Sequence, residues 1–428
     1  MGSVGGYLRS LRYDLPRGVY ILQAGLVLNA FGNGAANPFV VLYLHNVRGI
    51  PLWVAGLVAA TSAGFALASA LVAGSVADRR GARATMIGGL VCSAVAFGLY
   101  PLVREPWQAF ALAALAGTGG GTWLTMQSAL LAAITPAAVR HAAFAQQRVA
   151  ANIGLGLGGF IGGLVVITDR PGTFTVLFLL NAVTFGVYTL FVLRVPVPRS
   201  VRPAAARSRD YRDVLADRVF VRFAALNLLV VVGAVSLLNS LFPVYAKNQA
   251  NVSEHVIGAY FLLNSLVVIV LQMPIVRATE GRRRMRAFAL MGVLFAASWL
   301  QIAAGASFLG HTGVLLLLGA GIFTLSLAEC LHDAVQGPLV SDLAPPDLLG
   351  RYMSVMGFSW QLGFIIGPAV GGLLLSLEPA ALWPVMSMVC LLAGGYALML
   401  ERRLPTHARR NPRRAAAAST DLAPEPAR

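Results

Sequence analysis

The sequence predicts an all-α membrane protein with twelve transmembrane helices in two pseudo-symmetric six-helix halves. Three observations support this prediction: 57% of the residues are hydrophobic and only 12% are charged, the apolar residues form long blocks, and the basic residues are confined to alternate loops. A soluble chain of 428 residues needs more charged side chains to solvate its surface, whereas apolar blocks of about 20 residues match a bilayer core.

The apolar blocks are expected to form the transmembrane spans. The first six lie near Val19–Tyr43, Trp53–Ala77, Ala84–Val103, Trp107–Ile134, Ala142–Ile167 and Thr173–Leu193. The second six lie near Phe223–Ala246, Val256–Val276, Phe288–Ala306, Gly313–Val340, Tyr352–Leu377 and Ala380–Leu400. The first block is too long for the apolar core of a signal peptide, so we interpret it as a helix.

The basic residues indicate the orientation of the chain. Of the 33 Lys and Arg residues, 28 lie in the termini and in loops of one parity, whereas loops of the other parity hold only Arg48, Arg104, Arg170 and Lys247. The positive-inside rule then places both termini in the cytoplasm of a bacterial inner membrane. The net charge of +16 is therefore a topology signal that points to the lipid bilayer and not to nucleic acid.

The longest polar connection divides the chain. We expect an N-terminal half over residues 1–195, a basic cytoplasmic linker over 196–217, a C-terminal half over 218–403 and a disordered tail over 404–428. A short amphipathic helix is expected near Asp210–Asp217.

The two halves repeat each other in sequence. Met126–Gly163 and Val335–Gly372 align without gaps at a constant offset of 209 and share glutamine, proline and glycine positions. Paired six-helix halves are the architecture of alternating-access transporters, with the substrate site between them near the middle of the bilayer.

The second predicted loop carries a recognisable motif. From Gly74 to Arg83 it reads G-S-V-A-D-R-R-G-A-R, which resembles motif A of the major facilitator superfamily, G-x-x-x-D-[RK]-x-G-x-[RK]. The resemblance implies that Gly74, Asp78, Arg79, Gly81 and Arg83 form a latch that stabilises the outward-facing state. Gly74 would allow a close helix crossing and Gly81 a tight turn.

Acids near this latch differ between the halves. Asp78 is expected to face the positive N-terminus of the helix that begins near Arg351. Ala278 stands at the equivalent position of a degenerate copy in the second half. Asp342, near the end of span ten, is expected to pair with Arg283 or a neighbour.

Two further family motifs are incomplete. A glycine run in span five is similar to motif C of the family's antiporters, but Gly159 stands where proline is usual; the run comprises Gly154, Gly158, Gly159, Gly162 and Gly163. The arginine of motif B is replaced by Leu115, a departure from the family's usual proton-coupling scheme.

Charged residues inside spans are costly and point to function. Glu329 and Asp333 lie at i, i+4 in span ten and are candidates for proton coupling, because a carboxylate removed from water takes up a proton more readily. Arg148 in span five is expected to form a gate with Asp333 when the cytoplasmic side is closed; removing one partner from a dehydrated interface would cost about 3–5 kcal/mol. The alternative is that Arg148 extends to the headgroups and leaves Asp333 unpaired across the halves.

Other polar and aromatic residues in the spans are candidates for a substrate cavity, with interhelical hydrogen bonding as the alternative interpretation of the asparagines. They are Asn29, Asn33, Asn37, Trp123, Gln127, Asn152, Asn239, Asn264, Gln336 and Trp360. His332 is interpreted as a packing or rim residue.

The resemblance extends to the twelve-helix drug:H+ antiporters, which implies proton-coupled efflux of a small amphipathic organic compound by a monomer without cofactor or metal. An uptake symporter or facilitator for a small metabolite is the alternative within the same class. A membrane enzyme or sensor is disfavoured, because the sequence has no HExxH, GxSxG or phosphate-loop motif and no large soluble domain.

Overall fold

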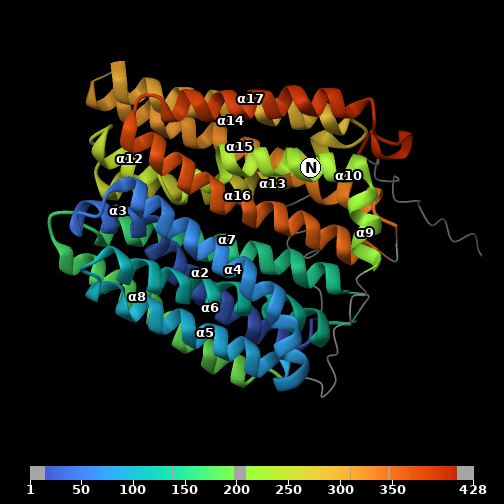
Figure 1. Cartoon of the computed structure of the whole chain (residues 1–428), viewed down its shortest axis with the longest axis horizontal. Helices are drawn as coiled ribbons and strands as arrows, with labels where there is room; N and C mark the ends of the chain where they lie inside the picture. The colour runs from blue at the N-terminus through green and yellow to red at the C-terminus, as the bar shows by residue number, and fades with distance from the viewer. Residues whose placement is uncertain (1–14, 137–138, 197–208, 309, 346–347, 412–428) are drawn as a thin grey trace, which may run out of the picture.

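The computed structural model describes residues 15–136, 139–196, 209–308, 310–345 and 348–411, which form helices in two groups (Figure 1). The first group contains α2 (Arg17–Ala36), α4 (Leu52–Arg80), α5 (Ala82–Leu99), α6 (Pro106–Ile134), α7 (Arg140–Val165) and α8 (Pro171–Leu193). The second contains α10 (Arg218–Val230), α13 (Glu254–Thr279), α14 (Arg284–Phe308), α15 (His311–Leu343), α16 (Leu349–Leu377) and α17 (Leu382–Glu401).

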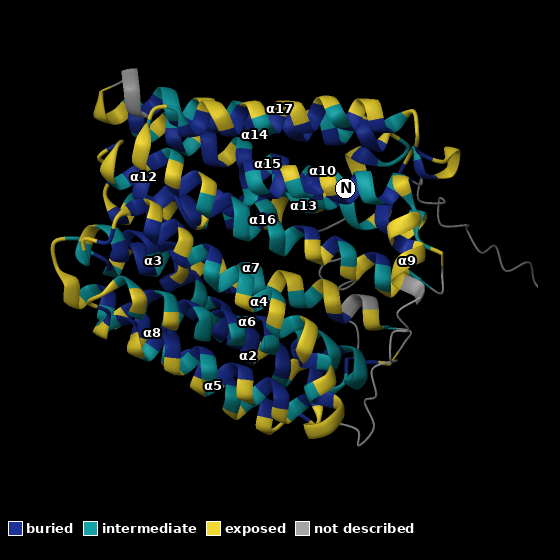
Figure 2. Ribbon diagram, viewed as in Figure 1, coloured by how far each residue is buried: buried dark blue, intermediate teal, exposed yellow. Residues whose placement is uncertain are grey.

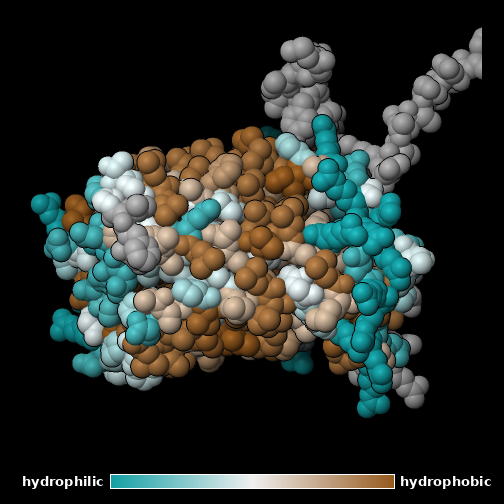
Figure 3. All heavy atoms as spheres, turned by 90° about the horizontal axis from the view of Figure 1, so that it is seen from above, coloured by the Kyte–Doolittle hydropathy of each residue, from teal (hydrophilic) through white to brown (hydrophobic). Residues whose placement is uncertain are grey.

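The described residues include eleven helices long and apolar enough to cross a membrane. The 29-residue α6 is not one of these eleven, although it packs between α4 and α5 inside the first group. Leucine and valine side chains such as Val183, Leu316 and Leu392 are exposed on the outer surface of the bundle, where Figure 2 shows alternating exposed and buried turns. Figure 3 shows a broad hydrophobic surface bordered by a hydrophilic rim. This surface is typical of a multi-span membrane protein.

The first and seventh predicted spans are not single regular helices. After α2 the chain passes through a 3-10 turn (Asn37–Phe39), α3 (Val40–Leu42) and a π-helical turn (Tyr43–Val47). After α10 it passes through a π-helical turn (Val231–Val235), α11 (Ser236–Leu238) and α12 (Phe242–Asn248). Pro38 and Pro243 fall in these stretches, where the missing backbone donor of proline interrupts the regular hydrogen-bond ladder.

The two groups meet through glycine-lined helix crossings. Here α4 packs on α16 and α7 packs on α13. A Cβ at Gly163 would lie 2.6 Å from the Cα of Gly258, and a Cβ at Gly56 would lie 3.2 Å from the Cα of Gly372. Side chains at these positions would force the groups apart, which explains why small residues are required there.

The bundle has two distinct ends. We call the end that carries Arg80, Arg140, Arg282 and Arg402 the arginine-rich end, which lies at the right in Figures 1 and 3, and the other the opposite end. The glycine crossings lie toward the opposite end, and the outline in Figure 1 widens toward the arginine-rich end. The groups are therefore closed against each other at one end and splayed at the other.

The connections at the arginine-rich end confirm one expectation and correct another. A short helix, α9 (Arg209–Ala216), forms where an amphipathic linker helix was expected, while residues 197–208 lie outside the described chain. The expectation of a disordered tail from residue 404 is wrong for its first part: residues 404–411 are folded, and a 3-10 turn spans Thr406–Ala408. The physical reason is that backbone hydrogen bonds join this segment to residues 281–284. Residues 412–428 lie outside the described chain.

Candidate functional site

A cavity of about 420 Å³ lies between the two helix groups. Its walls come from α2, α7, α13, α15, α16 and the irregular stretch after α10. Its polar and aromatic lining residues are Asn33, Asn37, Arg148, Asn152, Asn239, Phe261, Asn264, Ser265, Glu329, His332, Asp333, Trp360 and Phe364. Seven of these residues are amides or carboxylates, which bring hydrogen-bonding groups into the cavity. The rest of the wall is largely apolar or aromatic.

The two carboxylates of α15 have different partners. The Asn264 amide donates to Glu329 Oε2 over 2.8 Å and to Ser326 Oγ over 2.9 Å, so Glu329 is held by an uncharged donor. Asp333 accepts from the Arg148 guanidinium of α7 in an ion pair that joins the two groups. The four-residue spacing places both acids on one face of α15, and among the described residues a cation pairs with Asp333 and not with Glu329.

The Arg148–Asp333 pair forms, but not in the state in which it was expected. The expectation was a pair made when the arginine-rich ends are closed, whereas the structure contains it with those ends splayed. The Arg148 side chain is 61% exposed and the Asp333 side chain 15% exposed. Because solvent screens a pair of this kind, its contribution in this state is at most about 1 kcal/mol, and the larger value expected for a dehydrated interface does not apply here.

The asparagines of the first span form a ladder. Asn37 Nδ2 donates to Asn33 Oδ1 over 3.2 Å, and Asn33 Nδ2 donates to Asn29 Oδ1 over 2.7 Å. Asn33 and Asn37 line the cavity, whereas Asn29 is fully buried and is not a lining residue. The four-residue spacing therefore produces a hydrogen-bonded stripe of which only one end reaches the cavity.

Several expected cavity residues lie elsewhere. Trp123 packs edge-on against Phe185 and Tyr188, and the buried Gln127 accepts a hydrogen bond from the Tyr188 hydroxyl. Both residues lie in the interior of the first group, where aromatic packing and this hydrogen bond hold them. Gln336 is half-buried one turn beyond Asp333 and is not a lining residue of the cavity. Asn29, Trp123, Gln127 and Gln336 are thus corrected from cavity positions to packing or flanking positions.

The sequence did not predict a chain of buried, hydrogen-bonded polar residues behind the cavity. His332 Nε2 lies 2.8 Å from Asn227 Oδ1, and Asn227 Nδ2 donates to Ser359 Oγ over 2.8 Å. The His332 ring packs against Trp360 with centroids 5.3 Å apart, which makes it a packing residue at the cavity wall. An asparagine in the apolar first part of span seven was the available signal for Asn227.

The motif A loop is formed but its latch is not engaged. Gly81 adopts φ of 84°, the conformation that a tight turn requires, and Arg83 donates to the Val195 carbonyl. Asp78 is exposed and forms no ion pair with any described residue. A Cβ at Gly74 would meet nothing within 4 Å, so the close crossing expected there is absent in this state. With the groups splayed at this end, Asp78 has no ion-pair partner and Gly74 no close neighbour among the described residues.

The loop of the second group that corresponds to the motif A loop is held by ion pairs. Arg284 is fully buried and donates to Asp342 Oδ2 over 2.5 Å, which agrees with the expectation that Asp342 pairs with Arg283 or a neighbour. Arg283 instead pairs with Glu401, at 3.3 Å.

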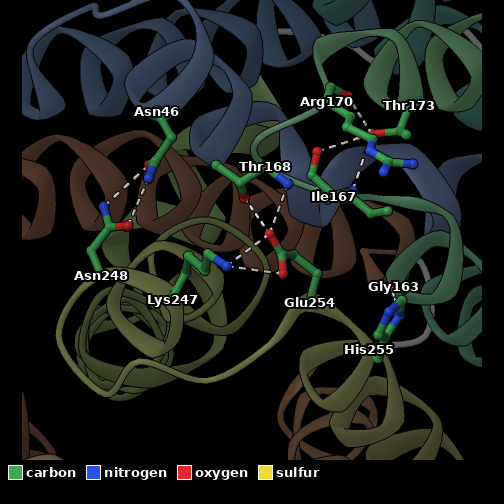
Figure 4. Close-up of polar contacts among 10 residues, drawn as sticks. All are labelled: Asn46, Gly163, Ile167, Thr168, Arg170, Thr173, Lys247, Asn248, Glu254 and His255. Carbon is green, nitrogen blue, oxygen red and sulfur yellow. Dashed lines mark hydrogen bonds and ion pairs between the residues drawn. The ribbon is translucent and has the colours of Figure 1, made fainter.

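Polar contacts close the opposite end (Figure 4). Asn46 and Asn248 exchange hydrogen bonds of 2.7 and 3.1 Å across the two groups. Glu254 accepts from the Thr168 backbone N–H over 2.9 Å and from Lys247 Nζ over 3.0 Å. These residues lie in loops and helix ends, and only Lys247 was noticed in the sequence, as a basic residue of the sparsely charged loops.

A family model described as Major Facilitator Superfamily matches residues 24–328 and 224–426, which together cover almost the whole chain. The chain belongs to the major facilitator superfamily. This family consists of transporters, so the chain is a transporter and not an enzyme.

Curated relatives of this superfamily member have names that describe different kinds of transporter. MFS-type transporter YhjO of Bacillus subtilis is 26% identical over 398 residues, covering 90% of this chain and 93% of the relative. A Na(+), Li(+), K(+)/H(+) antiporter of Planococcus maritimus is 24% identical over 364 residues, covering 77% and 83%. Multidrug resistance protein MdtH of Aeromonas hydrophila is 25% identical over 376 residues, covering 82% and 88%.

Solved structures share the fold of this superfamily member. A D-xylose-proton symporter superimposes with a TM-score of 0.73 at 13% identity, covering 92% of this chain and 99% of the symporter. The nucleoside transporter NupG gives a TM-score of 0.68 at 15% identity, covering 90% of this chain and 97% of that transporter. Identities this low bear on the fold and not on the substrate.

Proposed function

We propose that this chain is a proton-coupled exporter of a small amphipathic organic compound that works by alternating access. The observation that carries the proposal is the cavity between the two helix groups, which contains Glu329 and Asp333 and is closed at the opposite end. We further propose twelve spans, with α6 as the fourth, in two pseudo-symmetric halves of 1–195 and 218–403 joined by the linker at 196–217. The bundle sits in a bacterial inner membrane with the arginine-rich end in the cytoplasm.

Glu329 is the better candidate for the proton carrier. Its carboxylate is bonded to the neutral Asn264 amide, so that protonation breaks no ion pair. Asp333 instead forms an ion pair with Arg148 across the two helix groups, which suits it to a contact between the halves. We therefore assign proton uptake to Glu329 and the cross-half switch to the Arg148–Asp333 pair.

The lining favours an amphipathic and weakly cationic compound. Phe261, Trp360 and Phe364 supply aromatic surface, while Asn33 and Asn152 supply amides. Aromatic faces and carboxylates both attract organic cations. The names of the antiporter and multidrug relatives support efflux, while uptake remains the alternative direction within the same architecture.

Transport direction is tested with ethidium as an amphipathic cationic probe. In everted vesicles energised with an inside-acid pH gradient, we expect ethidium to accumulate, and dissipating the gradient to release it. Vesicles from cells that lack the protein provide the control. If ethidium accumulates only in right-side-out vesicles, the protein is an importer and not an exporter.

Topology is tested by reporter fusions at Ser208 and at Ser419. Both positions follow arginine-rich segments, so both fusions are expected to report a cytoplasmic location. A fusion at Gly310, between α14 and α15 at the opposite end, is the matched control and should report the periplasm. A periplasmic signal at Ser208 or Ser419 would contradict the twelve-span topology.

Replacing the motif A acid is expected to slow transport without lowering expression. Asp78 is exposed here, so Asp78→Asn should leave this state intact. The variant loses the contact with a helix N-terminus in the other state, worth about 1 kcal/mol, which shifts the state equilibrium about fivefold. Ethidium transport rates are compared with those of Asp213→Asn, an exposed acid of α9. Equal rates in both variants would show that the motif is only a loop.

Cross-linking the opposite end is expected to block transport. Because the Asn46 and Asn248 amides touch across the groups, Asn46→Cys with Asn248→Cys should form a disulfide on oxidation that prevents outward opening. Transport should stop after oxidation and return after reduction, while each single variant is unaffected by oxidant. Full transport by the cross-linked protein would exclude an opening at this end.

A further inference from the structure

A second cavity, of about 660 Å³, lies on the arginine-rich side of the second group, between α13 and α14 with α15 behind them. It is separate from the central cavity. Arg282, Arg283, Arg286 and Arg410 line its arginine-rich end. Leu290, Leu294, Leu327, Leu331 and Ile275 line the part that runs along the membrane-spanning helices. The cavity is thus cationic at one end and apolar along its length.

The folded tail segment positions one of these arginines. The backbone N–H of Gly281 donates to the Asn411 carbonyl over 3.0 Å, and the backbone N–H of Arg284 donates to the Arg409 carbonyl over 2.9 Å. The buried Arg284 guanidinium donates to Asn411 Oδ1 over 2.8 Å and to the Ala408 carbonyl over 3.1 Å. This pairing brings residue 410 beside residue 283, so two distant parts of the chain join their charges at one site.

The described lining of the cationic end supplies no counter-ion of its own. The described residues that line the cavity include four arginines and no carboxylate. Outside the lining, Glu401 pairs with Arg283 at 3.3 Å, and Asp342 is taken by the buried Arg284. Ala278, which lines the cavity, occupies the position that Asp78 holds in the first group. The second group therefore lacks the acid of the repeat at the position where its arginines cluster.

We propose that this cavity binds one anionic phospholipid, with its phosphate among the arginines and an acyl chain along the leucines. A soluble anion would use only the cationic end. From Arg286 to Leu294 the cavity follows α14 for about 12 Å into the apolar span, a depth that only a ligand with a hydrocarbon chain fills. The bilayer supplies such a ligand directly at the level where the arginines lie.

The test measures lipid retention by the purified full-length protein in neutral detergent, using native mass spectrometry. One phosphatidylglycerol is expected to stay bound where phosphatidylcholine with the same chains dissociates. Arg282→Gln with Arg286→Gln should weaken this binding by about 30-fold, because both replaced arginines contribute directly. Arg212→Gln with Arg218→Gln, exposed arginines at the same end but outside the cavity, should leave it unchanged.

A second variant and a competitor keep the test decisive. If the double arginine variant does not fold, Ala278→Asp places a carboxylate at an exposed lining position and should weaken phosphatidylglycerol binding about fivefold. Inorganic phosphate at millimolar concentration should not displace the lipid. Equal retention of both lipids, unchanged binding in Ala278→Asp, or displacement by phosphate would overturn the proposal.

Discussion

Replacing Glu329 by glutamine is expected to abolish ethidium transport driven by a pH gradient while exchange of ethidium across the membrane continues. Glutamine retains the shape of the side chain and an oxygen that accepts from the Asn264 amide, which now lies 2.8 Å from the carboxylate. It cannot take up or release a proton. Coupling should therefore fail although the cavity and the movement between states remain.

The measurement compares two assays on the same vesicles. Gradient-driven accumulation should fall to the level of protein-free vesicles, and counterflow of unlabelled against labelled ethidium should remain close to wild type. Gln301→Glu, which introduces a carboxylate elsewhere in the second group, provides a control for a change of charge alone. If gradient-driven transport persists in Glu329→Gln and in Asp333→Asn alike, the coupling site lies elsewhere.

Exchanging the charges of Arg148 and Asp333 is expected to separate a switch from an incidental pair. Arg148→Asp would place a third carboxylate beside Glu329 and Asp333, and Asp333→Arg would place two guanidinium groups together across the helix groups. Both single variants should be inactive, because like charges in the cavity favour separation of the halves. The double exchange restores opposite charges and should regain part of the transport.

The size of this effect depends on the state. With Arg148 largely exposed, the pair contributes at most about 1 kcal/mol to the observed state. Closing the arginine-rich ends would dehydrate it, and an unmatched charge there would cost about 3–5 kcal/mol, enough to depopulate that state. Arg140→Asp, a reversal at an exposed arginine of the same helix, should retain transport. A double exchange no more active than either single variant would argue against the switch.

The candidate site was only partly predictable from the sequence. A polar residue in a membrane span is visible in a sequence because it is costly there, and this pointed to Glu329, Asp333 and Arg148. The energetic cost of placing a polar residue in the membrane does not determine which way its side chain faces. Trp123 packs against Tyr188, and Gln127 accepts a hydrogen bond from the Tyr188 hydroxyl, so both lie inside the first group. Asn227 donates to Ser359 in a buried chain of polar residues behind the cavity.

The sequence by itself determined the membrane class, the family and the helical segments, because apolar block length, arginine distribution and the motif A spacing are local properties. It also predicted that Asp342 would pair with Arg283 or a neighbour, and the structure pairs it with Arg284. Only the tertiary structure decided which end is closed, that residues 404–411 fold onto residues 281–284, and that four arginines converge on one cavity. These features depend on contacts between residues far apart in the chain, and neither hydropathy nor spacing encodes the relative placement of two helix groups.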